Sequence, residues 1–445
     1  MTLRRAFDRP LFFALICTAS CLGSARLAAA DQPADPPAEA ATAESEYEAY
    51  AESHPYLNDE FSPGEGSESG IDELDQLLEP ETPILDSDDY PGLSGLVRRK
   101  FDSLYRETGL RLGFAATALG LTANGDDDPH GSAYDLDFMS GWTLVGRDTP
   151  DTGVLVATAE FRDRMGSDPA SAVGPQLGTL INTVNAFNDR DWVVRDAYWL
   201  QRFNGGKLRV LIGRADTSDF VGQQPMQNVN ALFANRSFSA NPTVPFPGHG
   251  PTVGVSYRPS DRYYVTGGIA NGYNNTRKSE FDTIGDADFF YSAEAGWTPQ
   301  VEGMGAGRYS IMVWRIDART ENGFASPSDD GVTLVAGQQL NNRFQVWGRY
   351  AHANGATTNI RNLAQAGIGY SGLFGSPSNM SGLAASFAEP RSSASRDEKV
   401  IEAFQRIQLS RFTQLSAGLQ VVFDPGNNPD EDRVELLYAR IRHAF

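Results

Sequence analysis

From residue 109 onward, hydrophobic residues alternate with polar or small residues in short segments, and clusters of Gly, Asn, Asp and Pro separate these segments. Alternation with a period of two is typical of β-strands that bury one face. The pattern predicts sixteen strands, which is an even number. They cover residues 109–123, 133–147, 153–165, 191–203, 207–214, 252–257, 262–272, 287–297, 307–318, 332–340, 343–353, 362–372, 382–388, 399–409, 413–423 and 433–445.

The connections between these segments alternate in length. Tight links such as 204–206 and 341–342 alternate with long ones such as 166–190 and 215–251, and only 298–306 and 373–381 fall on the short side without being tight. Outer-membrane barrels have short periplasmic turns and longer outer loops, whereas a soluble β-sandwich has no reason to keep such parity. The sequence therefore predicts an all-β fold, a transmembrane antiparallel β-barrel of about sixteen strands.

The N-terminal part of the chain has a different composition. Residues 1–30 combine three early arginines, an apolar stretch and a terminal run of alanines, the pattern of a cleaved signal peptide. Residues 31–92 are acidic, and most of the net charge of −20 lies there, since residues 31–97 hold 19 Asp or Glu and no Lys or Arg. This composition predicts a mostly disordered periplasmic prefix. Residues 93–445 then form the barrel, preceded by a short helix at 93–107.

Residues suited to catalysis or metal binding are scarce. Both cysteines, Cys17 and Cys21, lie in the predicted signal, so cleavage would leave a mature chain without thiols. The five histidines are scattered without metal-ligand spacing, and no nucleophile elbow or phosphate loop is present. Outside the N-terminus, no apolar run approaches the length of a membrane-spanning helix. We expect no enzyme, no cofactor, no metal site and no nucleic-acid partner.

The alternation also assigns each side chain to the lipid or to the lumen. We predict that seven inward-facing residues line the pore and contact the solute: Arg209, Trp347, Arg349, Glu402, Arg406, Tyr438 and Arg440. An arginine fork can hydrogen-bond two adjacent hydroxyls or one carboxylate, and an aromatic face can stack on a sugar ring. The alternative is that these arginines only line and solvate a non-selective pore. The faces of segment 191–203 stay open, because the charged residues Arg195 and Asp196 are adjacent.

The connection 215–251 is the longest internal one, and it is too apolar for a free outer loop. It holds Phe220, Met226, Phe233, Arg236, Phe238, Pro245 and Pro247. We expect this segment to fold into the barrel and narrow the pore.

The C-terminal sequence resembles the carbohydrate-selective porins of the OprB type. The matching positions are Glu398, Ile401, Glu402, Phe404, Arg406, Gln408, Leu419, Gln420, Pro425, Gly426 and the terminal Phe445. The stretch GRADTSDFVGQQPMQNVNALFANRSF also resembles the long segment that follows a Gly-Arg strand in this family. The resemblance implies a sixteen-stranded diffusion channel for mono- and oligosaccharides, with an arginine- and glutamate-lined constriction and a short helix before the first strand.

The sequence thus predicts an outer-membrane porin through which carbohydrates diffuse passively. The expected partners are sugars or other small hydrophilic solutes, outer-membrane lipid, and the barrel-assembly machinery, which would engage the strand ending at Phe445; a homo-oligomer is possible. Two alternatives stay open. One is an anion- or general-diffusion porin, because inward arginines outnumber inward glutamates; the other is a structural barrel that tethers the envelope through its acidic prefix.

Overall fold

The computed structural model describes residues 83–85, 92–124, 128–321 and 323–445. The predicted signal peptide and nearly all of the acidic prefix lie outside these residues. In the described part of the chain, no helix is both long enough and apolar enough to cross a membrane.

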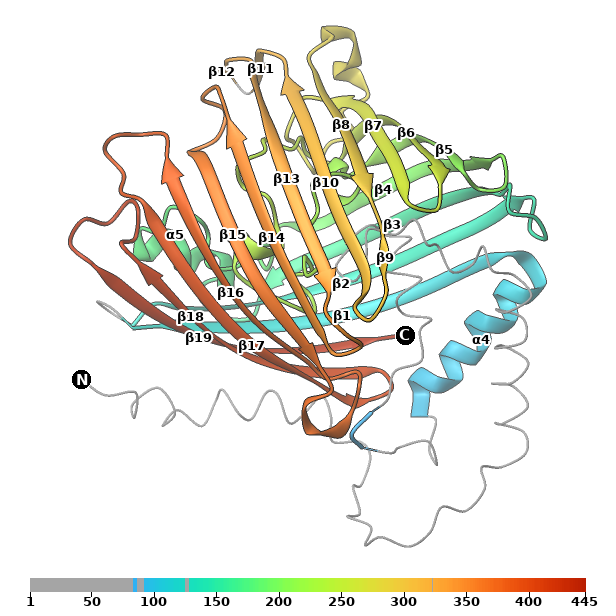
Figure 1. Ribbon diagram of the computed structural model, residues 1–445, viewed down its shortest axis with the longest axis horizontal. Coiled ribbons are helices and arrows are strands. Elements are labelled where there is room, and N and C mark those ends of the chain that lie inside the picture. Colours follow the sequence, from blue (N-terminus) through green and yellow to red (C-terminus); the bar gives the residue numbers. More distant parts are fainter. Residues whose placement is uncertain (1–82, 86–91, 125–127, 322) are drawn as a thin grey trace, which may run out of the picture. The chain divides into compact units, whose positions relative to one another are not determined.

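Strands make up most of the described chain (Figure 1). In chain order they are β1 (Leu110–Ala123), β2 (His130–Val145), β3 (Gly153–Arg164), β4 (Asp191–Phe203), β5 (Leu208–Ala215), β6 (Gly250–Ser260), β7 (Tyr263–Asn271), β8 (Phe289–Trp297), β9 (Gln300–Val301), β10 (Gly305–Ile316), β11 (Arg319–Glu321), β12 (Phe324–Ser326), β13 (Asp329–Gln339), β14 (Phe344–Ala353), β15 (Ile360–Ser371), β16 (Met380–Pro390), β17 (Glu398–Ser410), β18 (Thr413–Phe423) and β19 (Arg433–Ala444). The helices are α4 (Gly92–Thr108), α5 (Val173–Leu177) and α6 (Arg236–Ser239), and the 3₁₀ turns are η3 (Ala170–Ala172), η4 (Thr217–Asp219), η5 (Asp282–Asp286) and η6 (Leu373–Gly375).

Antiparallel pairing closes the strands into a barrel. Seventeen strands form one sheet, and β1 pairs with β2 on one side and with β19 on the other. Of these, β9 is a two-residue strand in the turn before β10, so sixteen strands form the wall. The prediction of a sixteen-stranded antiparallel barrel is confirmed. The alternation did not predict three short strands: β9, and β11 and β12, which form a separate hairpin in a long loop.

Burial along the strands follows the predicted alternation. In β14, for example, Phe344 and Tyr350 are exposed, whereas Trp347 and Arg349 are buried. The exposed apolar residues, such as Leu383 on β16 and Ile401 on β17, face away from the lumen and form the surface that lipid covers. The connections keep the predicted parity, with segments 165–190 and 216–249 on the long-loop side and 411–412 on the other.

Helix α4 occupies the short-turn side next to the start of β1, close to the predicted bounds. Arg147, in the turn after β2, donates from Nη2 to the carbonyls of Tyr105 at 2.8 Å and Arg106 at 2.7 Å, and from Nη1 to Glu107 at 3.2 Å. The last carbonyls of a helix lack intrahelical partners. A cation here satisfies them and interacts favourably with the negative end of the helix dipole.

Replacing Arg147 with alanine is expected to loosen the C-terminal turn of α4 by about 1–2 kcal/mol, because several carbonyls lose a charged donor. Trypsin should then cleave within α4, at sites such as Arg106, about tenfold faster, since about 1.4 kcal/mol corresponds to a factor of ten. The matched control is Arg262→Ala, which removes an exposed arginine from the β6–β7 turn. Equal cleavage rates in both variants would show that Arg147 does not hold the helix.

The first and last strands meet under an aromatic cluster. The Phe445 ring lies 6.2 Å from the Phe101 ring of α4 and 5.6 Å from the Phe114 ring of β1, measured between centroids. The backbone N–H and C=O of Phe445 both pair with Phe114, at 2.9 and 2.8 Å. Ser94 of α4 also contacts His443 of β19, with 2.8 Å between Oγ and Nε2. Helix α4 therefore contacts the seam at which the barrel closes.

Candidate functional site

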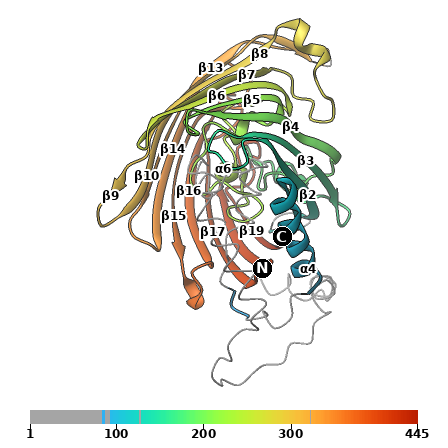
Figure 2. The same cartoon turned by 90° about the vertical axis from the view of Figure 1, so that its right-hand side faces the viewer.

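The segment 216–249 between β5 and β6 folds into the barrel, as its apolar sequence predicts. Figure 2 shows α6 and the adjoining chain enclosed by the strands. Asn235 caps α6 by accepting a hydrogen bond from Ser237 N at 2.9 Å, which fixes this turn locally. Gly222 has φ +71°, and a Cβ there would meet Met312 Sδ of β10 at 2.7 Å. The backbone of this segment, which we call the inner loop, thus closely approaches the wall.

Glu402 of β17 holds the backbone of the inner loop. Its carboxylate accepts from Ala234 N at 2.7 Å, from Asn235 N at 2.9 Å and from the Tyr438 hydroxyl of β19 at 2.8 Å. The Glu402 side chain is fully buried. Three donors on one buried carboxylate offset much of the cost of removing it from water.

Arg349 of β14 holds a second part of the inner loop. It donates to Gln227 Oε1 at 2.7 Å, to the Ser237 carbonyl at 3.1 Å and to the Ala240 carbonyl. Gln365 of β15 accepts from Arg349 Nε at 2.8 Å and so fixes the guanidinium from the wall side. Charge-assisted bonds of this kind are stronger than bonds between neutral groups.

Strand β19 and its neighbour β18 complete these attachments. Arg440 donates to the carbonyls of Leu232, at 2.8 Å, and of Val229. Gln420 of β18 accepts from Asn235 Nδ2 at 3.0 Å and donates to the Thr183 carbonyl at 2.9 Å. Because Thr183 belongs to the segment 165–190, one wall residue joins two inward-folded segments.

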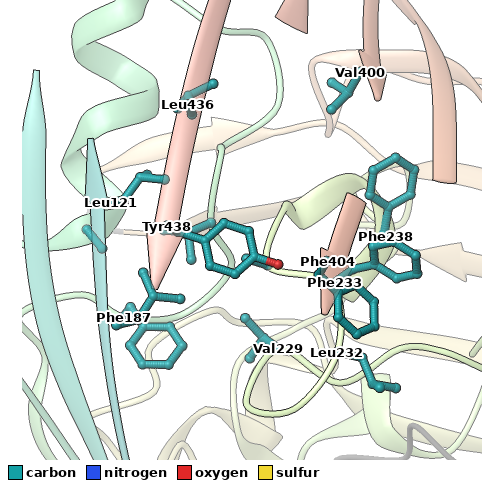
Figure 3. Packing of buried hydrophobic residues seen from close by; sticks show 14 of the residues in the cluster. Leu121, Phe187, Val229, Leu232, Phe233, Phe238, Val400, Phe404, Leu436 and Tyr438 are labelled. Atoms are coloured by element: carbon teal, nitrogen blue, oxygen red, sulfur yellow. The ribbon is translucent and has the colours of Figure 1, made fainter. Parts of the chain in front are cut away.

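Apolar packing reinforces the same attachment (Figure 3). Phe233 of the inner loop packs edge-on against Phe404 of β17, with centroids 4.8 Å apart. Phe238 lies beside Phe233, and both flank Trp347 of β14. Burial of such aromatic groups is a large favourable term. A core inside the barrel therefore fixes this part of the inner loop to β14, β16, β17 and β19.

The two ends of the inner loop are joined beside β4 and β5. Asp216, the first residue of the loop, lies 3.1 Å from His249, the last, measured from Oδ2 to Nε2. Burial lowers the pKa of His249 to about 4, so at neutral pH a neutral imidazole meets the carboxylate. Arg195 of β4 pairs with Asp219 three residues further on. These contacts join the two ends of the loop to each other and to β4.

An inward-facing charged cluster lies on β2 and β3, on the wall away from these attachments. One carboxylate oxygen each of Asp135, Asp137 and Glu160 lies within 4.8 Å of the others, and all three residues are buried. Arg162 pairs with Asp135 at 3.0 Å and with Glu160 at 2.8 Å, and Arg190 also pairs with Glu160. Two arginines thus compensate these acids. Sequence alternation could have identified them, since Asp135 and Asp137 share the face opposite Leu136.

The seven predicted pore residues divide into two groups. Five are at most 4% exposed because the inner loop covers them: Trp347, Arg349, Glu402, Tyr438 and Arg440. In this structure they are anchors of the loop, and the predicted contact with a solute would require the loop to move. Arg209 and Arg406 are half-buried, and for them solute contact stays a prediction. Arg406 donates to the Ser378 carbonyl at 3.1 Å.

A β-bulge resolves the faces of β4 that the sequence left open. In the register of β3 and β4, Thr158 faces Asp196 and Ala159 faces Val194, so Arg195 is an extra residue. A bulge of this kind lets two successive residues share one face. Both Arg195 and Asp196 are consequently buried, at 5% and 1% exposed.

Comparison with known proteins assigns the family. The model of the carbohydrate-selective porins, OprB family, matches residues 153–444, more than half of the chain. The chain belongs to the OprB family. Both the family and the barrel fold of this OprB-family protein point to a channel and imply an outer-membrane location.

Relatives of this OprB-family chain are distant in sequence. It is 25% identical to porin AaxA of Chlamydia abortus over 225 residues, covering 48% of this chain and 46% of that one. It is 20% identical to porin AaxA of Chlamydia trachomatis over 273 residues, covering 60% and 58%. The chain thus spans about half the length of the curated relatives that it matches. The high-pH structure of Pseudomonas putida OprB superposes with a TM-score of 0.67 at 16% identity, covering 82% of this chain and 99% of that one.

Proposed function

We propose that this protein is an outer-membrane channel through which mono- and oligosaccharides diffuse passively down their gradients. Membership of the carbohydrate-selective family supports the substrate class. The observation that carries the mechanism is the inner loop, which Glu402, Arg349 and Arg440 attach to β17, β14 and β19. A fixed narrowing lets a solute exchange part of its hydration shell for weak hydrogen bonds, which favours both entry and exit.

The geometry also supports a passive channel, because the narrowing is rigid. Wall residues hydrogen-bond several backbone groups of the loop, and the loop residues Phe233 and Phe238 pack into a core with Phe404. Moving a segment that is attached in this way would break its hydrogen bonds and its packing, so we expect the loop to stay in place while a solute passes. Selectivity would then come from the shape and the charge of the part of the lumen that stays open.

The test is swelling of liposomes that contain the mature protein, with glucose, larger oligosaccharides and amino acids of matched size. We expect sugars to enter faster than amino acids of equal size. Equal rates that depend on solute size alone would leave a general-diffusion porin and refute carbohydrate selectivity. Absence of swelling would refute the channel itself and favour the structural role of the acidic prefix.

The same proposal includes how the chain reaches the membrane. The signal pattern at 1–30 supports export and cleavage, and the acidic segment 31–92 would then remain in the periplasm. The strand ending at Phe445 would engage the barrel-assembly machinery. A homo-oligomer is compatible with this arrangement, and its presence can be measured by the mass of the detergent-extracted protein.

A further inference from the structure

Carboxylates that face the barrel interior are covered by protein. On the membrane-spanning strands, eight inward-facing acids are at most 3% exposed: Asp135, Asp137, Glu160, Asp196, Glu294, Asp329, Glu398 and Glu402. Asp191, which is exposed, is the first residue of β4 and lies at the strand end. They accept hydrogen bonds from backbone N–H groups, as Glu402 does, or pair with arginines, as Glu294 does with Arg308 at 3.0 Å. In the inner loop, Asp219 is 2% exposed and Asp216 pairs with His249. A solute in the lumen therefore meets little negative charge on these elements.

Arg236 differs from every other residue of the inner loop. All residues from 216 to 249 are described, and Arg236 is the one exposed residue among them. It is the first residue of α6, and its guanidinium has no hydrogen-bond or ion-pair partner among the described residues. The loop is attached around it, because Glu402 binds Asn235 on one side and Arg349 binds Ser237 on the other.

These neighbours place Arg236 well inside the barrel. Glu402 and Arg349 occupy the middle of β17 and β14, not the strand ends. The backbone N–H of Arg236 donates to the Asn182 carbonyl at 3.1 Å, so the second inward-folded segment supports the same turn. Hydrogen bonds to both neighbours of Arg236 thus hold its exposed guanidinium at the narrow part of the channel.

Half-buried arginines on the wall add further positive charge to the lumen. Arg209 of β5, Arg258 of β6 and Arg406 of β17 face inward and keep partial exposure. The charges that water can reach in this part of the barrel are therefore arginines, while the acids are covered.

From this distribution we infer that the channel favours carbohydrates that carry one carboxylate, such as uronic or aldonic acids, over neutral sugars of the same size, and that Arg236 contacts this carboxylate. The inference rests on the proposed function and deepens its substrate class. A guanidinium pairs with a carboxylate through two parallel hydrogen bonds, whereas a hydroxyl pair offers no opposite charge. Because Arg236 is exposed, water screens the pair, which keeps binding weak enough for release.

The test measures reversal potentials in planar bilayers under gradients of potassium chloride and potassium glucuronate, together with glucose-driven swelling of liposomes. For the wild-type channel we expect anion preference and measurable glucuronate permeability. In Arg236→Gln, glucuronate permeability should fall about tenfold relative to chloride, as expected from loss of one charge-assisted contact. Glucose entry should change little, and Arg236→Lys should restore most of the anion preference but less of the glucuronate permeability.

Arg262→Gln is the matched control, because it removes an exposed arginine from a short turn outside the lumen. Unchanged glucuronate permeability in Arg236→Gln would overturn the role of Arg236. A wild-type channel that passes glucose but excludes glucuronate would overturn the acidic-sugar inference and leave the proposed function intact. A channel that passes neither solute would refute the proposed function itself.

Discussion

Replacing Glu402 with alanine is expected to release the central part of the inner loop and raise the single-channel conductance. The substitution leaves two buried backbone donors, Ala234 N and Asn235 N, without their acceptor. Each orphaned donor costs about 1–3 kcal/mol, so the attached state loses its advantage over a state in which the loop moves into the water-filled lumen. Liposomes that contain the Glu402→Ala variant should then swell with larger oligosaccharides, whereas liposomes that contain the wild-type protein should exclude them.

Two variants calibrate this expectation. Tyr438→Phe removes one bond to Glu402 and retains both bonds to the loop, so its conductance should stay near the wild-type value. Glu389→Ala removes an exposed carboxylate at the end of β16 that pairs with Arg361, and it should change neither conductance nor size limit. If Glu402→Ala conducted like these two variants, the loop would be held without Glu402.

Arg349→Ala should weaken the loop attachment further, by about 3 kcal/mol or more. Arg349 donates to Gln227, Ser237 and Ala240 of the loop. Its loss leaves Gln227 Oε1 and the Ala240 carbonyl without this donor beside a cavity, whereas the Ser237 carbonyl keeps its bond from Gln365. Trp347 reports the change, because the loop residues Phe233 and Phe238 flank it. In urea, tryptophan emission should shift at a lower concentration than in the wild type, before the barrel unfolds.

The control for this measurement is Arg361→Ala, which removes a half-exposed arginine from β15 and should leave the tryptophan transition unchanged. Barrel unfolding is followed separately by the heat dependence of electrophoretic mobility. Coincident transitions for Arg349→Ala and the wild type would contradict the proposed attachment.

Much of the barrel can be predicted from the sequence, because a lipid-facing and a water-facing side impose the same period of two on every spanning strand. For β4 and β18, even the predicted bounds agree with the structure. The hairpin of β11 and β12 was missed because three-residue strands are too short to display a period. The faces of the adjacent residues Arg195 and Asp196 could not be assigned from the sequence, because they depend on a β-bulge that is set by pairing with the partner strand.

Prediction of the site was limited for a different reason. Alternation gives the direction of a side chain such as Arg349, but it does not say whether water or another segment lies opposite. The apolar composition of 215–251 predicted that this loop folds inward, yet it did not reveal that Glu402 and Arg349 bind its backbone. Arg236 could not be distinguished from other arginines of the chain, because its exposure depends on how wall residues bind the neighbouring loop residues.

The aromatic seam links barrel completion to protection of the N-terminal helix. Phe101 of α4 packs against the ring of Phe445, and Ser94 hydrogen-bonds His443, a partner 349 positions away in the sequence. Since these partners reach their places only when β19 pairs with β1, the part of the α4 docking surface that β19 supplies forms when the barrel closes. A chain with an open seam would therefore leave this side of α4 exposed, and a quality-control protease would distinguish unfinished barrels from closed ones by cleavage of this helix.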